Sequence, residues 1–177
     1  MNRHTSIRPA TPRDAGVVVD VLREAALWLE QTGMPMWRGD ELVAARIVAD
    51  VAAGLFFLAE CGGEVAGTVK FQLEDSEFWP DVPPHEAAYI HRLAVRRHYA
   101  GKGVSSALLH WAVGRTASLG RRCLRLDCEA SRPRLRAFYE RFGFCHHSNR
   151  RVGLYVVSRY EYEVTKSSNP GRSPTAR

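Results

Sequence analysis

One segment constrains the fold of this chain more than any other, because a strand pattern, two glycines and a helical pattern follow one another within it. The segment 93–106 reads LAVRRHYAGKGVSS. Gly101 and Gly103 have no Cβ, so they permit positive φ angles and let a ligand approach the backbone closely. The amides after them would lie at the positive end of a helix, which favours an anion. The segment therefore predicts either a cradle for a phosphate-bearing cofactor or an ordinary tight turn.

The length and composition predict one globular domain. The chain has 177 residues, of which 45% are apolar and 25% are charged, and a chain of this kind can bury a single core. No apolar run approaches the roughly 20 residues of a membrane-spanning helix, and residues 1–6 lack the apolar core of a signal peptide. We therefore expect a domain over residues 1–165, a disordered tail over residues 166–177, a cytoplasmic location and no membrane partner.

The charge and the cysteines narrow the classes of function. The formal net charge of +6 suits a nucleic acid or a polyanionic cofactor. No sequence signature of a groove-binding module accompanies this charge, so a nucleic acid is not the expected partner. The four cysteines have no CxxC spacing, and they indicate neither a zinc site nor a disulfide framework. We therefore expect no metal.

The hydrophobic pattern predicts an α/β fold with a mixed sheet. The expected strands cover residues 7–10, 55–60, 64–73, 87–95, 121–129, 144–148 and 152–164. The expected helices cover residues 11–31, 40–53, 104–119 and 133–142. Asp40 and Ser131 are expected to cap the second and fourth helices, and residues 149–151 to form the last turn. Within the strand 87–95, alternation places the side chains of Tyr89, His91, Leu93 and Val95 on one face.

Two motifs together resemble those of the GNAT superfamily of acyl-CoA-dependent N-acyltransferases. The first is LAV at residues 93–95 followed by GKGV at residues 101–104, and the second is AFYERFGF at residues 137–144. The resemblance covers roughly residues 6–164. It implies a single-domain α/β fold with a mixed, mostly antiparallel sheet of about six to seven strands and about four helices. Two splayed strands, those of Leu93 and Leu126, would form the cleft for acetyl-CoA.

The resemblance also implies which residues bind acetyl-CoA as the cosubstrate. The pantetheine arm would pair with the strand at Leu93 and Val95, and the diphosphate would rest on the amides of the glycine turn. The implied cofactor-binding residues are Leu93, Ala94, Val95, Gly101, Lys102, Gly103, Val104, Ser105, Ser106 and Arg132. The chain departs from the family pattern at Ala100, at Ser105 and at Arg132. The Arg132 side chain would either meet a phosphate or face water.

Acetyl transfer needs a neutral amine, a polarised thioester and a proton for the departing thiolate. Tyr139 matches the position of the family's general acid, since a phenol is protonated at neutral pH; otherwise it is a core aromatic residue. His91 and Asp127 are candidates for the base, because imidazole accepts a proton readily near neutrality, whereas a carboxylate needs burial or a bridging water. Otherwise His91 is a hydrogen-bonded core residue and Asp127 pairs with Arg125 or Arg92.

The acceptor pocket is expected to be walled by two aromatic loops. Trp37 lies in one of them, although it could instead pin that loop to the core, and Trp79 lies in a proline-rich connection. Glu74 or Asp75 would hold a cationic amine. Cys128 has no histidine at an activating spacing, so direct attack by the amine is expected rather than an acyl-cysteine.

The resemblance favours an N-acetyltransferase that acts on the primary amine of a small molecule. The alternatives are a protein or peptide N-acetyltransferase and an acyl-CoA sensor with little turnover. A homodimer is compatible with the family.

Overall fold

The computed structural model describes residues 5–37 and 39–164, which form one mixed sheet of seven strands in the order β1-β2-β3-β4-β5-β7-β6. The strands are β1 (Thr5–Pro9), β2 (Phe56–Cys61), β3 (Glu64–Gln72), β4 (Ala87–Val95), β5 (Cys123–Glu129), β6 (Cys145–Val152) and β7 (Tyr155–Glu163). β4 and β5 pair in parallel, and the other neighbouring strands pair antiparallel. This arrangement confirms the predicted fold class.

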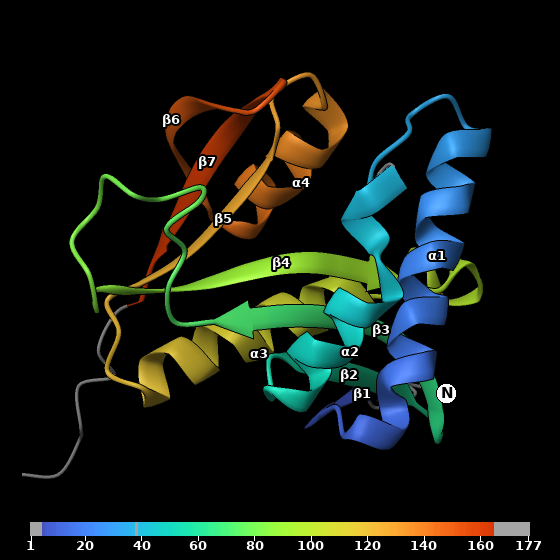
Figure 1. Cartoon of the computed structure of the whole chain (residues 1–177). Coiled ribbons are helices and arrows are strands. Elements are labelled where there is room, and N and C mark those ends of the chain that lie inside the picture. The colour runs from blue at the N-terminus through green and yellow to red at the C-terminus, as the bar shows by residue number, and fades with distance from the viewer. Residues whose placement is uncertain (1–4, 38, 165–177) are drawn as a thin grey trace, which may run out of the picture.

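Four α-helices and three short 3-10 helices cover the sheet in the described part of the chain (Figure 1). They are η1 (Pro12–Asp14), α1 (Ala15–Gln31), η2 (Gly39–Leu42), α2 (Ala44–Ala52), η3 (Arg97–Tyr99), α3 (Val104–Ser118) and α4 (Pro133–Phe142). On one face, Leu22 of α1 and Val51 of α2 are buried in the same cluster as Leu58. On the other face, Leu108 of α3 and Tyr139 of α4 share a larger cluster. The sheet therefore separates two apolar cores.

Three local predictions are wrong. The second helix begins at Ala44 rather than at Asp40, because residues 39–42 form the separate 3-10 helix η2. The Glu41 carbonyl accepts a hydrogen bond from the Arg92 side chain instead of from a helical amide. Ser131 does not cap α4, since its hydroxyl donates to Glu129. Residues 149–151 belong to β6, and the turn to β7 falls at residues 153–154, where glycine adopts a φ of 55°. The predicted tail at residues 166–177 lies outside the described residues.

A β-bulge in β4 changes which side chains share a face. Arg92 has a φ of 54°, and β4 contains one residue more than β3 across this point. Leu93 and Val95 therefore pack into the core that contains α3, whereas Tyr89 packs with Trp79 in a separate cluster. The prediction that Tyr89, Leu93 and Val95 share one face is wrong, because a single extra residue reverses the alternation that follows it.

Strands β4 and β5 separate soon after they begin. Their parallel pairing covers residues 87–89 of β4 and 123–125 of β5. On its other edge β5 pairs with β7 over residues 123–129, and Figure 1 shows β5 diverging from β4 toward α4. The edge of residues 90–95 that faces away from β3 therefore has no strand partner in the sheet. This divergence is the splayed pair that the sequence predicts.

Gly67 lies where β3 passes beside the bulged strand. A Cβ there would be 2.8 Å from the Ala94 carbonyl oxygen and 3.2 Å from Val104 Cγ1. We expect Gly67→Ala to lower the free energy of unfolding by about 1–3 kcal/mol, because backbone cannot yield as a flexible side chain does. Gly114→Ala is the control in α3, where the added Cβ meets nothing within 4 Å; it should stabilise by about 0.5–1 kcal/mol. Urea unfolding measures both, and equal effects would contradict this close contact.

Candidate active site

The glycine turn presents backbone amides without a side-chain cap. Gly101 has a φ of 72° and Gly103, the N-cap of α3, has a φ of 84°. No side chain caps this helix, and the amides of its first turn have no helical carbonyl to bond. A Cβ on either glycine would meet nothing within 4 Å, so the space beside the turn is open. These features fit a diphosphate bound at the positive end of a helix.

A hollow between α3 and α4 lies next to this turn. It has a volume of about 220 Å³ and is lined by Ser106, Phe138, Arg141 and Phe142. Ser106 belongs to the first turn of α3, so the hollow continues from the open amides. Its aromatic rings and guanidinium suit a ligand that is partly apolar and partly anionic.

His91 of β4 is held by a carboxylate on one side and faces another on the opposite side. Its Nε2 lies 2.9 Å from Asp75 Oδ2, and its Nδ1 lies 3.6 Å from Asp127 Oδ1. Asp75 is buried and also accepts a hydrogen bond of 3.0 Å from the Phe78 amide. Burial acts to raise the pKa of Asp75, but bonding to His91 and backbone amides outweighs it, so the net pKa is lowered. An ionised Asp75 can only accept a hydrogen bond, so in the neutral imidazole Nε2–H donates to it and the lone pair lies on Nδ1.

Asp127 of β5 lies buried beside this lone pair. Its side chain is 10% exposed, and Oδ1 has no hydrogen-bond partner in the described part of the chain. Burial raises the pKa of Asp127 to about 6, and a positive charge on His91 acts in the opposite direction. The reading of Asp127 as a partner of Arg125 is wrong, because Arg125 binds Glu86, Glu161 and Tyr89 instead.

These three side chains also satisfy the distance requirement for a metal site, since one ligand atom from each lies within 4.8 Å of the others. Asp75 and His91 are joined by a direct hydrogen bond, however, so only Nδ1 and Asp127 Oδ1 face a common space. A catalytic zinc ion takes three protein ligands. The geometry therefore suits a proton or an ammonium group between two acceptors better than a metal ion.

Tyr139 and Cys128 are both held in their protonated forms. Tyr139 is 7% exposed and packs between the rings of Phe144 and Tyr160. Burial raises its pKa well above the ordinary value, with Cys128 and Asp127 close enough to add to the effect. Burial also raises the pKa of Cys128 to about 12. A thiol that does not ionise is a poor nucleophile, so an acyl-cysteine has no support here.

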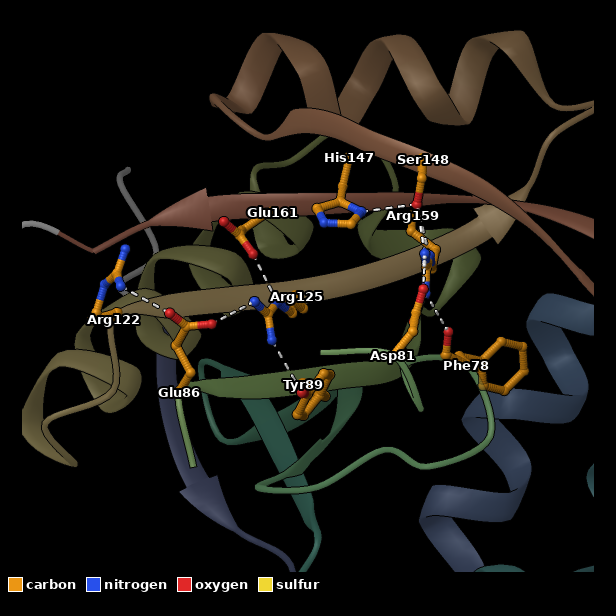
Figure 2. A network of polar contacts seen from close by, with 10 residues as sticks. All are labelled: Phe78, Asp81, Glu86, Tyr89, Arg122, Arg125, His147, Ser148, Arg159 and Glu161. Carbon is orange, nitrogen blue, oxygen red and sulfur yellow. Dashed lines mark hydrogen bonds and ion pairs between the residues drawn. The ribbon is translucent and has the colours of Figure 1, made fainter. Parts of the chain in front are cut away.

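Trp79 is not a wall of the acceptor pocket, and that prediction is wrong. Its side chain is 2% exposed and lies between two guanidinium groups, 5.2 Å from Arg125 and 4.7 Å from Arg159. Figure 2 shows these arginines directed into networks of polar contacts, Arg125 with Glu86 and Arg159 with Asp81. The two networks fix the connection between β3 and β4, and Trp79 fills the space between them.

Arg132 binds groups of the protein itself, whereas the sequence predicts a side chain that meets a phosphate or faces water. Its side chain is 12% exposed, and Nε donates to Glu129 over 3.0 Å. Nη1 donates to the Met34 carbonyl over 3.0 Å, and Nη2 donates to the Pro35 carbonyl. Arg132 therefore ties the loop before Trp37 to the start of α4.

The other two predicted acceptor residues, Glu74 and Trp37, do not contact His91 or Asp127 in any interaction found among the described residues. Glu74 is exposed and lies 3.5 Å from His85, whereas its neighbour Asp75 points to His91. Trp37 has a φ of 56° and its ring lies 5.6 Å from the Arg92 guanidinium. A hollow of about 620 Å³ adjoins Trp37 and is lined by α1 and by residues 35–37.

Known proteins with similar sequences show which family this chain belongs to. A model described as the acetyltransferase (GNAT) family matches residues 23–144. A Bacillus subtilis protein described as the uncharacterized N-acetyltransferase YesJ is 32% identical over 144 residues, 77% of this chain and 79% of that protein. This chain belongs to the GNAT acetyltransferase family. It is accordingly an acyltransferase, and the family's acyl donor is acetyl-CoA.

Solved structures support the membership. A GNAT acetyltransferase from Listeria monocytogenes is 25% identical, with a TM-score of 0.78 over 90% of this chain and 94% of that one. The PaiA N-acetyltransferase of Thermoplasma acidophilum, solved with coenzyme A, has the same fold at 18% identity, a TM-score of 0.71, and coverage of 90% and 99%. Among the described residues, no helix of this GNAT member has the length and apolar character needed to span a membrane.

The raised pKa of Asp127 makes stability depend on pH. Folded Asp127 keeps its proton up to about pH 6, whereas the unfolded carboxyl loses it near the ordinary pKa of 3.8. The free energy of unfolding therefore falls by up to about 3 kcal/mol as pH rises through this window. Asparagine cannot ionise, so we expect Asp127→Asn to be about 1–3 kcal/mol more stable than the wild type at about pH 8.

Urea unfolding at about pH 5 and about pH 8 measures this difference. Asp20→Asn on the exposed face of α1 is the control and should keep the wild-type pH dependence. If Asp127→Asn follows the wild-type curve at both pH values, Asp127 is not the buried carboxylate described above.

Proposed function

We propose that this GNAT member transfers the acetyl group of acetyl-CoA to the primary amine of a small molecule, at the opening between β4 and β5. One observation carries the proposal: His91 is fixed by Asp75 and turns its other nitrogen toward the unpartnered, buried carboxylate oxygen of Asp127. This pair of acceptors lies where the two strands part. Family membership supports the reaction type, and the geometry supports an amine as the group that is bound.

The cofactor-binding part of the proposal rests on backbone groups. The open amides of the α3 first turn would hold the diphosphate, and the unpaired edge of β4 at Leu93 and Val95 would pair with the pantetheine arm. When bound, acetyl-CoA supplies an acetyl group activated as a thioester. The departures at Ala100 and Ser105 change side chains and leave the amides of the turn in place.

The amine would bind between His91 and Asp127. Their facing atoms are 3.6 Å apart, which is too far for a direct hydrogen bond but allows one nitrogen to donate to both. An ammonium group bound there would give a proton to Nδ1, because the hydrogen bond to Asp75 stabilises the resulting imidazolium. His91 is thus the proposed base, Asp127 binds the ammonium, and Asp75 orients the ring.

Tyr139 is the proposed general acid. Its raised pKa keeps the phenol protonated, and its side chain packs in the same cluster as Cys128 of β5, on the side of the sheet that carries α3. A protonated phenol can donate to the departing thiolate. The cytoplasmic location and the homodimer remain predictions.

Calorimetric binding of acetyl-CoA, combined with thiol release across a panel of primary amines, tests the proposal. We expect binding together with thiol release for at least one small amine. Binding without thiol release on any small amine or peptide would favour the acyl-CoA sensor. An absence of binding would contradict both functions.

The role of Tyr139 is tested by removing its hydroxyl group. We expect Tyr139→Phe to lower kcat at least about tenfold, which corresponds to about 1.4 kcal/mol of barrier, because the thiolate loses its proton donor. The Kd for acetyl-CoA should change less than about twofold, since the ring remains in place. Tyr155→Phe on the exposed part of β7 is the control. An unchanged kcat would make Tyr139 a core residue only.

A further inference from the structure

Arg92 carries a buried N–H group that nothing in the described part of the chain satisfies. Its Nη2 donates to the Glu41 carbonyl over 2.7 Å, but Nη1 is buried without a hydrogen-bond partner. None of the ion pairs found among the described residues includes Arg92. A guanidinium stays charged under all ordinary conditions, and a buried charge without a partner is costly. A ligand that accepts a hydrogen bond from Nη1 would remove this cost.

The backbone at Arg92 is arranged to direct this side chain. Arg92 is the bulged residue of β4, and its φ of 54° is uncommon for any residue except glycine. Such a conformation is strained and is found preferentially at functional sites. The bulge sends the guanidinium to the Glu41 carbonyl and over the Trp37 ring, both in the segment that joins α1 to α2.

His91 lies on the same face of the sheet. It pairs across the strands with Lys70, whose ammonium binds Asp50 of α2 over 2.7 Å. Cross-strand partners share a face, so the imidazole of His91 and the guanidinium of Arg92 both lie on the side of α1 and α2. The orphaned donor and the two acceptors that would bind the amine therefore lie on the same side of the sheet.

The site therefore combines two unsatisfied groups of opposite character. Among residues 5–37 and 39–164, Asp127 Oδ1 is a buried acceptor without a donor, and Arg92 Nη1 is a buried donor without an acceptor. A simple amine would satisfy only the first. A ligand that carries both an ammonium and a carboxylate group would satisfy both, and a carboxylate is the anion that guanidinium groups bind most readily in proteins, together with phosphate.

We propose that the acceptor of this enzyme is an amino acid or another amino carboxylate, and that Arg92 binds its carboxylate while the amine lies between His91 and Asp127. This inference rests on the proposed function, because it names the class of acceptor for the same site. It assigns Arg92 a role in specificity that amine transfer alone does not require.

Matched acceptors test the inference in the wild-type enzyme. Each set contains an amino carboxylate, its methyl ester and the amine that lacks the carboxyl group: alanine with ethylamine, 4-aminobutanoate with propylamine, and phenylalanine with phenethylamine. In at least one set we expect kcat/KM for the acid to exceed that of both partners at least about tenfold. An α-amino ester is less basic than its acid and has more free amine at neutral pH. A preference for the acid therefore cannot arise from the fraction of free amine.

Variants of Arg92 then test whether this residue causes the preference for the acid over the amine. Arg92→Gln should reduce the ratio of kcat/KM between acid and amine at least about fivefold, and Arg92→Lys should retain part of it because the charge remains. Arg115→Gln, the same change at an exposed position of α3, should leave the ratio at its wild-type value. Circular dichroism and thermal unfolding check that each variant is folded. If Arg92→Gln does not fold, Arg92→Lys and the wild-type comparison still decide.

The outcomes separate this inference from the proposed function. Thiol release that is as fast with amines and esters as with acids in every set overturns the carboxylate site and leaves amine acetylation standing. A loss of activity in Arg92→Gln that is equal for acids and amines also overturns it. An absence of thiol release with every acceptor overturns the proposed function and the inference with it.

Discussion

The brief parallel pairing of β4 and β5 is the constraint on which the rest of the structure depends. Three residue pairs hold the two strands together, and beyond them β5 stays paired with β7 alone. The bulge at Arg92 follows soon after this point on β4. Together they leave one strand edge unpaired and reverse the faces of the residues beyond it. The unpaired edge and the open turn before α3 meet on the α3 side, and the polar cluster around His91 lies on the other side.

Ion pairs that lie outside the polar cluster of Asp75, His91 and Asp127 hold that cluster in place. The connection between β3 and β4 carries Asp75, and it contains almost no regular structure that would fix its position. Arg125 and Arg159, whose side chains are each 4% exposed, bind acidic partners and enclose Trp79 of this connection. Loss of an acidic partner would leave a buried guanidinium charge with fewer partners, which is costly. The orientation of His91 therefore depends on ion pairs that do not touch it.

The sequence predicts the parts of the fold that depend on local pattern. The bounds of β4, the glycine turn and the glycine that ends α4 all follow from short-range preferences of the backbone, and the structure has them as expected. The alternation of apolar and polar residues does not predict the bulge, because a register shift depends on the partner strand. The arginine inside an otherwise apolar strand is the one sequence feature that points to it.

Side-chain partners far apart in the sequence could not be predicted either. Arg132 binds a carbonyl 97 residues away and Arg159 binds Asp81 78 residues away, so neither partner follows from neighbouring residues. The same reason explains Trp79, which resembles an exposed loop aromatic until the two arginines that enclose it are known. His91 and Asp127 could be named as candidates, but only the fold brings them together and adds Asp75 to orient the imidazole.

Amide hydrogen exchange, measured residue by residue by NMR with and without coenzyme A, tests most directly whether the parting of β4 and β5 forms the cofactor site. We predict that coenzyme A slows exchange of the amides of residues 90–95 that point away from β3 and of the amides in the first turn of α3, with no change in β1 and β2. Protection confined to the hollow beside Trp37, with no change along β4, would contradict it.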